Sequence, residues 1–327
     1  MKILAKCSLI ILLICLFNTA EAQIGTGKWT RKADFSGQPR YNAVSFSING
    51  KAYVGLGSST TEGTQPYMDF REYNPATNTW TKKADCACGS LTGATAFSVG
   101  GKGYLAGGNS HRKLFEYNPA TNTWAEKALM PNVPQGGRLS VGFAINGKGY
   151  VVETALTKQV FEYNPATNTW VVKPNQFPGT GRHSATGMAI GNKGYLGTGV
   201  EDDFNPDPLN DWWEYNPATD TWTQKADYGG GKIGGAMSFS VNGKGYVVMG
   251  KSKEQNNSDG HKNETWEYNP ATNMWIKKAT APGDYRKNGI GLSIGTKGYI
   301  GLGEYNYEQA HKDFYEFDPA VLPLKTN

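Results

Sequence analysis

The chain has 327 residues, of which 38% are hydrophobic and 42 are glycine, and 33 basic residues against 28 acidic ones give a formal net charge of +5. This mild positive charge gives no reason to expect a nucleic-acid partner. Beyond Ala22 no segment is apolar over enough length to cross a bilayer, so no membrane span is predicted.

The segment 1–22 has the pattern of a signal peptide. Lys2 and Lys6 form a positive start, an apolar run extends from Ser8 to Phe17, and Ala20-Glu21-Ala22 carries the small residues that signal peptidase reads. Cleavage would make Gln23 the first mature residue. An uncleaved anchor is the alternative, but the apolar run is too short to span a bilayer. We therefore predict export to the periplasm or the extracellular space.

One octapeptide recurs along the rest of the chain. Tyr-Asn-Pro-Ala-Thr-Asn-Thr-Trp occurs unchanged at 73–80, 117–124 and 163–170, near copies stand at 215–222 and 268–275, and a decayed copy begins at Phe317. Successive copies start 44 to 53 residues apart, a period typical of arrays of one repeated supersecondary unit. The repeat predicts one array over 23–319, followed by a short tail at 320–327.

Each repeat has the pattern of four antiparallel strands. In the first, an alternating apolar run at 43–48 precedes Asn49-Gly50-Lys51, which suits a type I′ hairpin turn. A second strand and a variable loop follow, and the third strand ends in Glu72-Tyr73. Asn-Pro-Ala-Thr-Asn then favours a tight reversal into the strand that carries Trp80. Four such strands make one blade of an all-β propeller.

These repeats resemble the Kelch repeat of the galactose oxidase-like superfamily, over residues 27–319. The resemblance rests on the octapeptide and on the Asn-Gly-Lys-x-Tyr hairpin. It departs at the Gly-Gly pair after the hairpin, which only Gly107-Gly108 keeps, whereas the third repeat has Val151-Val152-Glu153. The resemblance implies a β-propeller, and the hairpin tyrosines at 53, 104, 150, 195, 246 and 299 give six blades.

The repeat count also predicts how the ring closes. Six hairpins carry a tyrosine, but the first repeat tryptophan, Trp29, has no hairpin before it, and the last unit has no tryptophan after Phe317. We predict that the N-terminal strand around Trp29 completes the last blade, which leaves no long strand edge exposed.

Length variation points to the functional face. The segment from the hairpin tyrosine to the next Asn-Pro aromatic has 13 residues in blades 2 and 3 and 18 to 22 in the others. Binding residues concentrate on variable loops held by a rigid scaffold. We therefore predict a bowl-shaped site on the face that carries these loops.

Cations and aromatic residues recur in the connections on that face. The candidate ligand-binding residues are Arg40, Arg138, Arg182, Lys232, Arg286, Tyr41 and Tyr285. Cations near the mouth of a channel would focus a positive potential, and arginine forks match carboxylates and sulfates. The alternative is that each arginine pairs with a backbone carbonyl or a neighbouring acid.

The histidines, a cluster of acids and the two cysteines are weak candidates for metal ligands. The four histidines are spread over blades 2, 4, 5 and 6, and the acids at 201–203, Asp207 and Asp211 fit no standard calcium loop. Cys86 and Cys88 are expected to be structural or bridged, with a Cu(I) dithiolate as the alternative. We therefore predict no cofactor.

Three functions remain in view. The main hypothesis is a non-catalytic module that binds a glycan, a peptide or another anionic ligand. The second is an enzyme similar to the sialic acid mutarotases, which are exported six-bladed Kelch proteins acting on a carboxylated sugar. The third, a copper enzyme like galactose oxidase, implies two tyrosines and two histidines around copper on a seven-bladed ring, and this chain fits it poorly.

Overall fold

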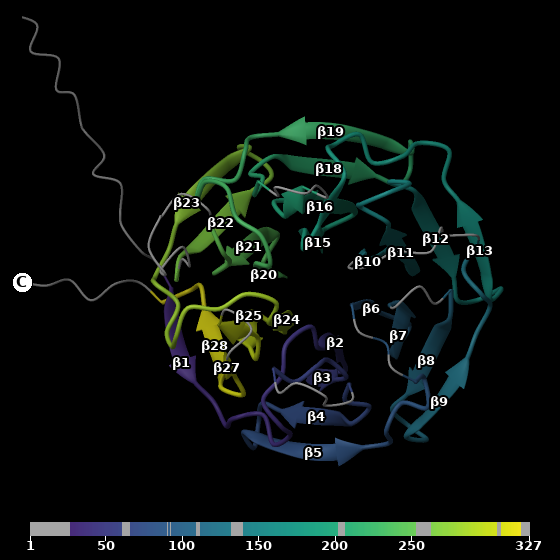
Figure 1. Ribbon diagram of the computed structural model, residues 1–327, viewed down its shortest axis with the longest axis vertical. Coiled ribbons are helices and arrows are strands. Elements are labelled where there is room, and N and C mark those ends of the chain that lie inside the picture. Colours follow the sequence, from purple (N-terminus) through teal and green to yellow (C-terminus); the bar gives the residue numbers. More distant parts are fainter. Residues whose placement is uncertain are drawn as a thin grey trace, which may run out of the picture.

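The computed structural model describes residues 27–60, 66–89, 91, 93–108, 112–131, 140–201, 207–252, 263–305 and 309–321. Within these ranges the chain forms strands and no helix. Six four-stranded antiparallel sheets stand around a central channel (Figure 1), which confirms the predicted six-bladed propeller. No helix long and apolar enough to cross a bilayer occurs among these residues.

The blades follow one another along the chain, each running from the channel outward. Blade 1 comprises β2 (Val44–Ile48), β3 (Lys51–Gly55), β4 (Phe70–Asn74) and β5 (Thr79–Lys83). Blade 2 comprises β6 (Ala94–Val99), β7 (Lys102–Gly107), β8 (Leu114–Asn118) and β9 (Thr123–Glu126). Blade 3 comprises β10 (Val141–Ile145), β11 (Lys148–Val152), β12 (Val160–Asn164) and β13 (Thr169–Val172).

Blade 4 comprises β15 (Thr186–Ile190), β16 (Lys193–Gly197), β18 (Trp212–Asn216) and β19 (Thr221–Lys225). Blade 5 comprises β20 (Met237–Val241), β21 (Lys244–Val248), β22 (Thr265–Asn269) and β23 (Met274–Lys277). Blade 6 comprises β24 (Ile290–Ile294), β25 (Lys297–Gly301), β28 (Phe314–Asp318) and β1 (Lys28–Arg31). Two short ribbons, β14 (Arg182–His183) with β17 (Val200–Glu201) and β26 (Glu304–Tyr305) with β27 (Gln309–Ala310), complete the described strands.

The N-terminal strand closes the ring as predicted. In Figure 1, β1 in purple lies beside β28 in yellow, and Trp29 is the register partner of Phe317. The Trp29 ring packs on Phe317 and on Phe239 of blade 5, with centroids 4.8 and 6.4 Å away. Its indole N–H lies 3.3 Å from the Thr265 hydroxyl and from the Ala279 carbonyl. The first strand therefore completes blade 6 and also contacts blade 5.

Side chains of the octapeptide form hydrogen bonds to the connection from the preceding blade. Asn78, in the left-handed conformation with φ 53°, accepts hydrogen bonds from the Tyr73 hydroxyl at 2.8 Å and from the Ala33 N–H at 2.9 Å. The Trp80 indole donates to the Ala33 carbonyl at 2.9 Å. Tyrosine, asparagine and tryptophan thus bind the strand connection that enters their own blade, and the later copies repeat these bonds.

The hairpin lysine and the glutamate before each octapeptide belong to a repeated charge cluster. In blade 1, Glu72 accepts from the Tyr53 hydroxyl at 2.7 Å and lies 2.7 and 3.2 Å from the Lys51 and Lys83 ammonium groups. Burial alone would raise the pKa of Glu72, but these hydrogen bonds outweigh burial and lower it. Burial, followed by the hydrogen bond to Glu72, raises the pKa of Tyr53. This uniform face is stabilised by structural ion pairs.

Glu153 explains why blade 3 departs from the repeat. Its side chain is buried, and its carboxylate accepts hydrogen bonds from the backbone N–H groups of residues 155–158 and from the Thr157 hydroxyl. Burial would raise the pKa of Glu153, but these bonds outweigh it and lower the pKa. The short loop of this blade is therefore built around one carboxylate.

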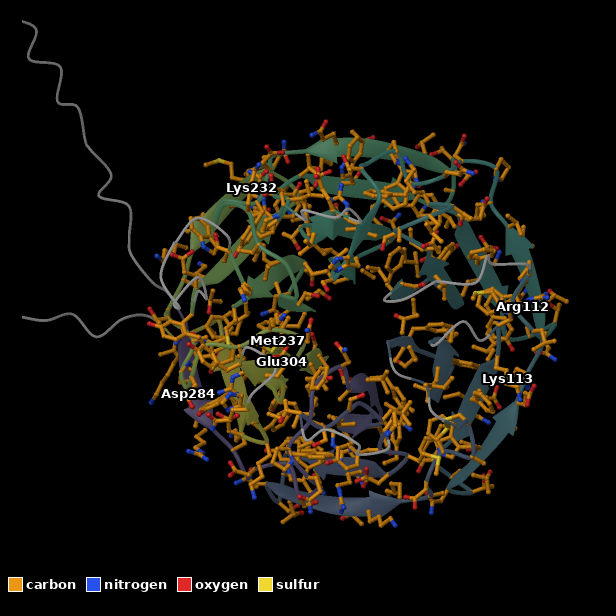
Figure 2. All side chains as sticks on the ribbon, viewed as in Figure 1. Arg112, Lys113, Lys232, Met237, Asp284 and Glu304 are labelled. Carbon is orange, nitrogen blue, oxygen red and sulfur yellow. A yellow bond between two sulfur atoms is a disulfide. The ribbon has the colours of Figure 1, made fainter. Side chains whose placement is uncertain are left out.

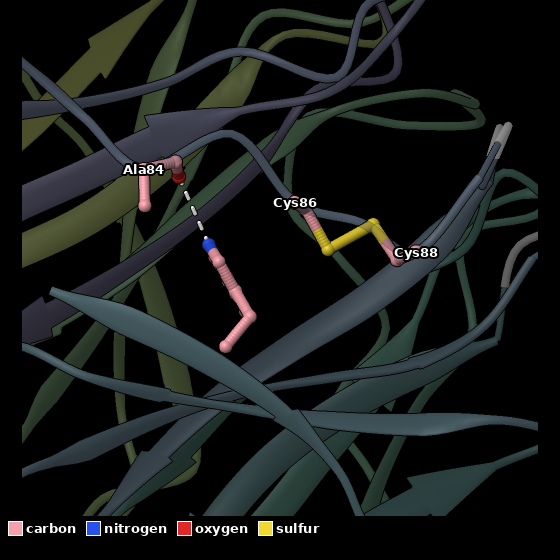
Figure 3. The surroundings of a disulfide bond; sticks show 4 residues. Ala84, Cys86 and Cys88 are labelled. Atoms are coloured by element: carbon pink, nitrogen blue, oxygen red, sulfur yellow. Dashed lines mark hydrogen bonds between the residues drawn. A yellow bond between two sulfur atoms is a disulfide. The ribbon is translucent and has the colours of Figure 1, made fainter.

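Cys86 and Cys88 form a disulfide (Figure 3). Both residues are buried in the cluster between blades 1 and 2, together with Phe70 and Leu105. The nearby Ala84 carbonyl accepts a hydrogen bond from the Trp124 indole at 3.0 Å. The bridge thus belongs to the connection that enters blade 2.

Candidate functional site

The central channel opens on the variable face through a small mouth. A cavity of about 130 Å³ there is lined by small residues of the described blades, among them Asn42, Ser140, Ser184, Gly235 and Asn288. None of the described residues that line the channel is charged. A polar ligand at this mouth would meet amide, hydroxyl and backbone groups first.

A ring of left-handed residues shapes this mouth. Asn42, Gly93, Ser184, Gly235 and Asn288 hold equivalent positions before the innermost strand, with φ between 52° and 74°. Backbone hydrogen bonds join four of them: the Gly235 N–H donates to Ser184 at 2.9 Å, Asn288 to Gly235 at 2.8 Å, and Asn42 to Asn288 at 2.8 Å. Blades 4, 5, 6 and 1 are therefore tied into a rigid arc.

A second layer of residues, the mouth ring, begins one residue earlier in each of these blades. It is formed by four equivalent backbone bridges: Tyr41 with Ser58, His183 with Val200, Gly234 with Lys251, and Lys287 with Glu304. The scaffold repeats here but the side chains do not. This is the pattern expected where one fold carries a specialised site.

The mouth ring gathers groups that can move protons or bind anions. It holds one imidazole, one phenol, two ammonium groups and one carboxylate, from His183, Tyr41, Lys251, Lys287 and Glu304. His183 Nδ1 lies 3.2 Å from the Ser184 hydroxyl, and the Lys287 ammonium lies 3.5 Å from Glu304 Oε1. Figure 2 shows Glu304 in blade 6, on the side of the ring nearest the channel in this view. Such a set suits acid–base chemistry on a polar ligand.

The predicted arginines lie elsewhere and are already paired. Arg40, Arg182 and Arg286 are at most 1% exposed. Each makes two hydrogen bonds to an aspartate just before the third strand of its blade: Asp69, Asp211 and Asp313, respectively. We call these three pairs the arginine clamps. The three guanidinium groups are therefore paired with acids inside the protein. This is the alternative to ligand binding, in which each arginine pairs with a neighbouring acid or a backbone carbonyl.

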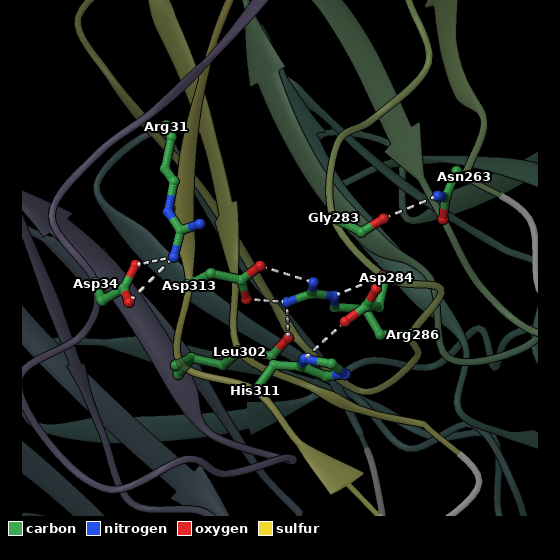
Figure 4. A network of polar contacts seen from close by, with 9 residues as sticks. All are labelled: Arg31, Asp34, Asn263, Gly283, Asp284, Arg286, Leu302, His311 and Asp313. Atoms are coloured by element: carbon green, nitrogen blue, oxygen red, sulfur yellow. Dashed lines mark hydrogen bonds and ion pairs between the residues drawn. The ribbon is translucent and has the colours of Figure 1, made fainter.

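The clamps also hold backbone groups. In blade 4 the Arg182 Nε donates to the Thr180 carbonyl at 2.9 Å and Nη1 donates to Thr198 at 3.0 Å. In blade 6 (Figure 4), burial would raise the pKa of Asp313, but hydrogen bonds and charge from Arg286 outweigh it and lower the pKa. The clamps therefore stabilise the loops behind the mouth.

The other predicted site residues are dispersed. Lys232 is exposed, because Ile233 takes the buried position that arginine occupies in blades 1, 4 and 6. Tyr285 is 44% exposed, beside Asp284 in the connection into blade 6. Arg138 lies outside the described residues. Of the seven predicted residues, Tyr41 is the one that the described structure places in the mouth ring.

Some of the histidines and acids considered as metal ligands can be placed in the structure. Among the described residues no three histidine, cysteine, aspartate or glutamate side chains gather into a metal-binding group. His111, His261, Asp202 and Asp203 lie outside the described residues. Asp211 belongs to an arginine clamp, and Glu201 pairs with Arg182 through the backbone of β17 and β14.

His311 covers the clamp of blade 6 and introduces a pH-sensitive group. It stands two residues before Asp313, where blades 1 and 4 have Tyr67 and Leu209, and is 7% exposed. Its Nδ1 lies 4.0 Å from Asp284 Oδ2, while Nε2 has no hydrogen-bond partner among the described residues. Burial and then the charge of Arg286 lower the pKa of His311, against smaller opposing effects of Asp313 and Asp284.

Acidification should therefore destabilise wild type more than a His311→Leu variant, which copies blade 4. Because the folded-state pKa of His311 is lowered, the unfolded chain binds the proton more readily once the pH falls below the ordinary histidine pKa, about 6.5. Urea midpoints at about pH 7.5 and about pH 5 would measure this. Equal acid-induced loss in both proteins would show that His311 does not contribute.

Comparisons with known proteins add a local likeness. No protein-family profile matches the chain. Over 90 residues, 27% of this chain, it is 40% identical to the N-acetylneuraminate epimerase of Escherichia coli O157:H7. The N-acetylneuraminate epimerase of Shigella sonnei (strain Ss046) is 39% identical over the same length. Each match spans about a quarter of the relative, 24% of its length.

The fold is also similar to a solved structure, that of YjhT. The TM-score is 0.69, and the match covers 86% of this chain and 96% of YjhT at 20% sequence identity. This likeness shows a shared fold. The relatives that share local sequence carry the name of an enzyme, so the prediction of a non-catalytic binding module was wrong, and the comparisons favour its enzymatic alternative.

Proposed function

We propose that the protein is a sugar epimerase that acts on N-acetylneuraminate or a closely related carboxylated sugar at the channel mouth. The observation that carries this proposal is the 40% identity over 90 residues with an N-acetylneuraminate epimerase, in a chain that shares the fold of YjhT. Membership of the Kelch class, and export directed by the segment 1–22, are parts of the same proposal.

The chemistry asked of the site is proton transfer. To exchange its two anomers, a cyclic sugar loses a proton from the anomeric hydroxyl and gains one on the ring oxygen as the ring opens, and the reverse steps close it. No electron is transferred to or from the sugar. An imidazole can both accept and donate a proton, and His183 is the imidazole of the mouth ring.

Other polar groups of the mouth could bind such a sugar. The amides of Asn42 and Asn288 and the hydroxyl of Ser184 line the cavity and match sugar hydroxyl groups. On the blade 5 and 6 side, the mouth ring holds the ammonium groups of Lys251 and Lys287 and the carboxylate of Glu304. An ammonium group that meets the ligand would favour a carboxylated sugar over a neutral one.

The test is NMR observation of anomer exchange. N-acetylneuraminate liberated as a single anomer should equilibrate faster with the purified protein than in buffer alone. Galactose, which has no carboxylate, should show a much smaller acceleration. A rate for N-acetylneuraminate equal to the buffer rate would contradict the proposed function, and equal acceleration of galactose would contradict recognition of the carboxylate.

A His183→Gln variant should lower the rate of anomer exchange by about 10²- to 10⁴-fold, the usual contribution of a general acid–base group. Glutamine keeps a polar side chain beside Ser184 but cannot exchange protons near neutral pH. Lys232→Ala is the matched control, because Lys232 is exposed and lies outside the mouth ring. A His183→Gln variant with the wild-type rate would remove His183 from the reaction.

A further inference from the structure

Glu304 breaks the repeat at the channel mouth. The equivalent residues of the other described blades are Ser58, Ala155, Val200 and Lys251, so Glu304 is the one acid at this position in the five blades described there. It is also fully buried, with 0% of its surface exposed. Burial of a carboxylate is unfavourable unless specific partners compensate it, and so its presence requires a reason.

The partners of Glu304 belong to the mouth. Its Oε1 accepts a hydrogen bond from the Asn288 amide at 3.2 Å and lies 3.5 Å from the Lys287 ammonium. Backbone hydrogen bonds of 3.0 and 3.1 Å fix Glu304 against Lys287 in both directions. Asn288 lines the cavity, and 12% of the Lys287 side chain is exposed. The buried carboxylate therefore contacts two residues of the candidate site.

Other buried carboxylates have local structural reasons. Glu267 accepts from the Tyr246 hydroxyl at 2.6 Å and pairs with Lys278 at 3.2 Å, in the cluster that recurs on the opposite face. Glu153 is satisfied by the backbone of its own loop. Glu304 differs from both because its side chain accepts a hydrogen bond from a lining residue and pairs with a mouth-ring cation.

We propose that Glu304 is a positioning residue of this site. It holds the Lys287 ammonium in place and fixes the Asn288 amide, so that the two side chains meet a carboxylated sugar in one defined arrangement. Glu304 itself does not touch the ligand. The inference rests on the proposed function for the identity of the ligand, but it concerns binding and can be read separately from turnover.

The experiment compares Glu304→Gln with Glu267→Gln in the full-length protein. The probe is N-acetylneuraminate, its binding is measured by calorimetry, and anomer exchange is measured by NMR on the same samples. Glu304→Gln should weaken binding and raise KM by about tenfold, the equivalent of one charged hydrogen bond, with a smaller change in kcat. Glu267→Gln should lower thermal stability and leave binding unchanged.

Lys287 provides the second arm. Lys287→Met should weaken binding to a similar degree, and adding Glu304→Gln to it should weaken binding little further, because both changes remove one coupled arrangement. Glu304→Asp keeps the charge and should recover part of the affinity. If Glu304→Gln shows no cooperative unfolding and is therefore misfolded, the binding of Lys287→Met tests the inference instead. Wild-type affinity of Lys287→Met for N-acetylneuraminate would overturn it.

The outcomes separate the two proposals. Wild-type KM and affinity in Glu304→Gln overturn the positioning role and leave the epimerase proposal standing. Binding without anomer exchange in wild type, together with weakened binding in the variants, overturns the epimerase proposal and supports the positioning role. No binding of N-acetylneuraminate and no anomer exchange in wild type would overturn both.

Discussion

Replacing Arg182 with alanine should lower the free energy of unfolding by about 3–5 kcal/mol, the usual loss when one partner of a buried ion pair is removed. The guanidinium is fully buried, and the Asp211 carboxylate that it leaves behind is only 21% exposed. The variant also loses the hydrogen bonds from the Arg182 side chain to the carbonyls of Thr180 and Thr198. It loses as well the cation–π contact in which Arg182 Cζ lies 5.1 Å from the centroid of the Phe177 ring. Urea denaturation near neutral pH measures the change.

Two control variants test whether the loss of stability comes from the buried ion pair. Lys232→Ala removes an exposed cation of the same predicted set and should change stability by no more than about 0.5 kcal/mol. Replacing Arg182 and Asp211 together with leucine should recover much of the loss, since apolar residues can substitute for a buried pair. Wild-type stability of Arg182→Ala combined with lost ligand binding would instead return Arg182 to the ligand site.

The architecture could be predicted because it rests on local, repeated chemistry. Asn49 and Gly50 take the positive φ angles of 50° and 74° that their hairpin requires. Blades 2, 3 and 5 repeat both positive angles, whereas blades 4 and 6 have one, at Gly191 and Gly295. The unmatched Trp29 at one end and the missing tryptophan at the other left one arrangement that closes the ring. These inferences needed no knowledge of distant contacts.

The role of the arginines depended on such contacts and was harder to anticipate. A sequence signal did exist: an aspartate follows Arg40 and Arg182 by 29 residues and Arg286 by 27, and in each case it precedes the third strand. Lys232 has no such aspartate and lies one residue out of register, next to the buried Ile233. Pairing within repeats, rather than charge alone, would have identified the clamps.

Apart from Tyr41, the residues of the mouth ring were not predicted as ligand-binding residues from the sequence. Lys287 precedes the inner hairpin of blade 6 and Glu304 follows it. No repeated motif links them, because the bridge carries different residues in each of the four blades where it is described. A buried glutamate in a variable loop looks like any exposed acid until its burial is known. The ligand was equally hidden, since a propeller is a scaffold for unrelated functions.

Deleting residues 1–33 should abolish cooperative folding of the ring. The deletion removes β1, so the β28 strand loses its outer partner along the register pairs from Lys28–Asp318 to Arg31–Tyr315. It also exposes Phe317 and Phe239, which Trp29 covers. A free, apolar strand edge invites association with other chains. We expect aggregation or a broad unfolding transition by circular dichroism and size-exclusion chromatography.

Two further chains locate the cause in β1 itself. A chain that begins at Gln23 retains β1 and should unfold as the full chain does. Trp29→Ala keeps the strand but loses the indole that packs on Phe239 and Phe317, which should lower stability by about 3–5 kcal/mol. If the chain without residues 1–33 unfolded as sharply as the one that begins at Gln23, blade 6 would be stable with three strands. Ring closure by β1 would then contribute no stability.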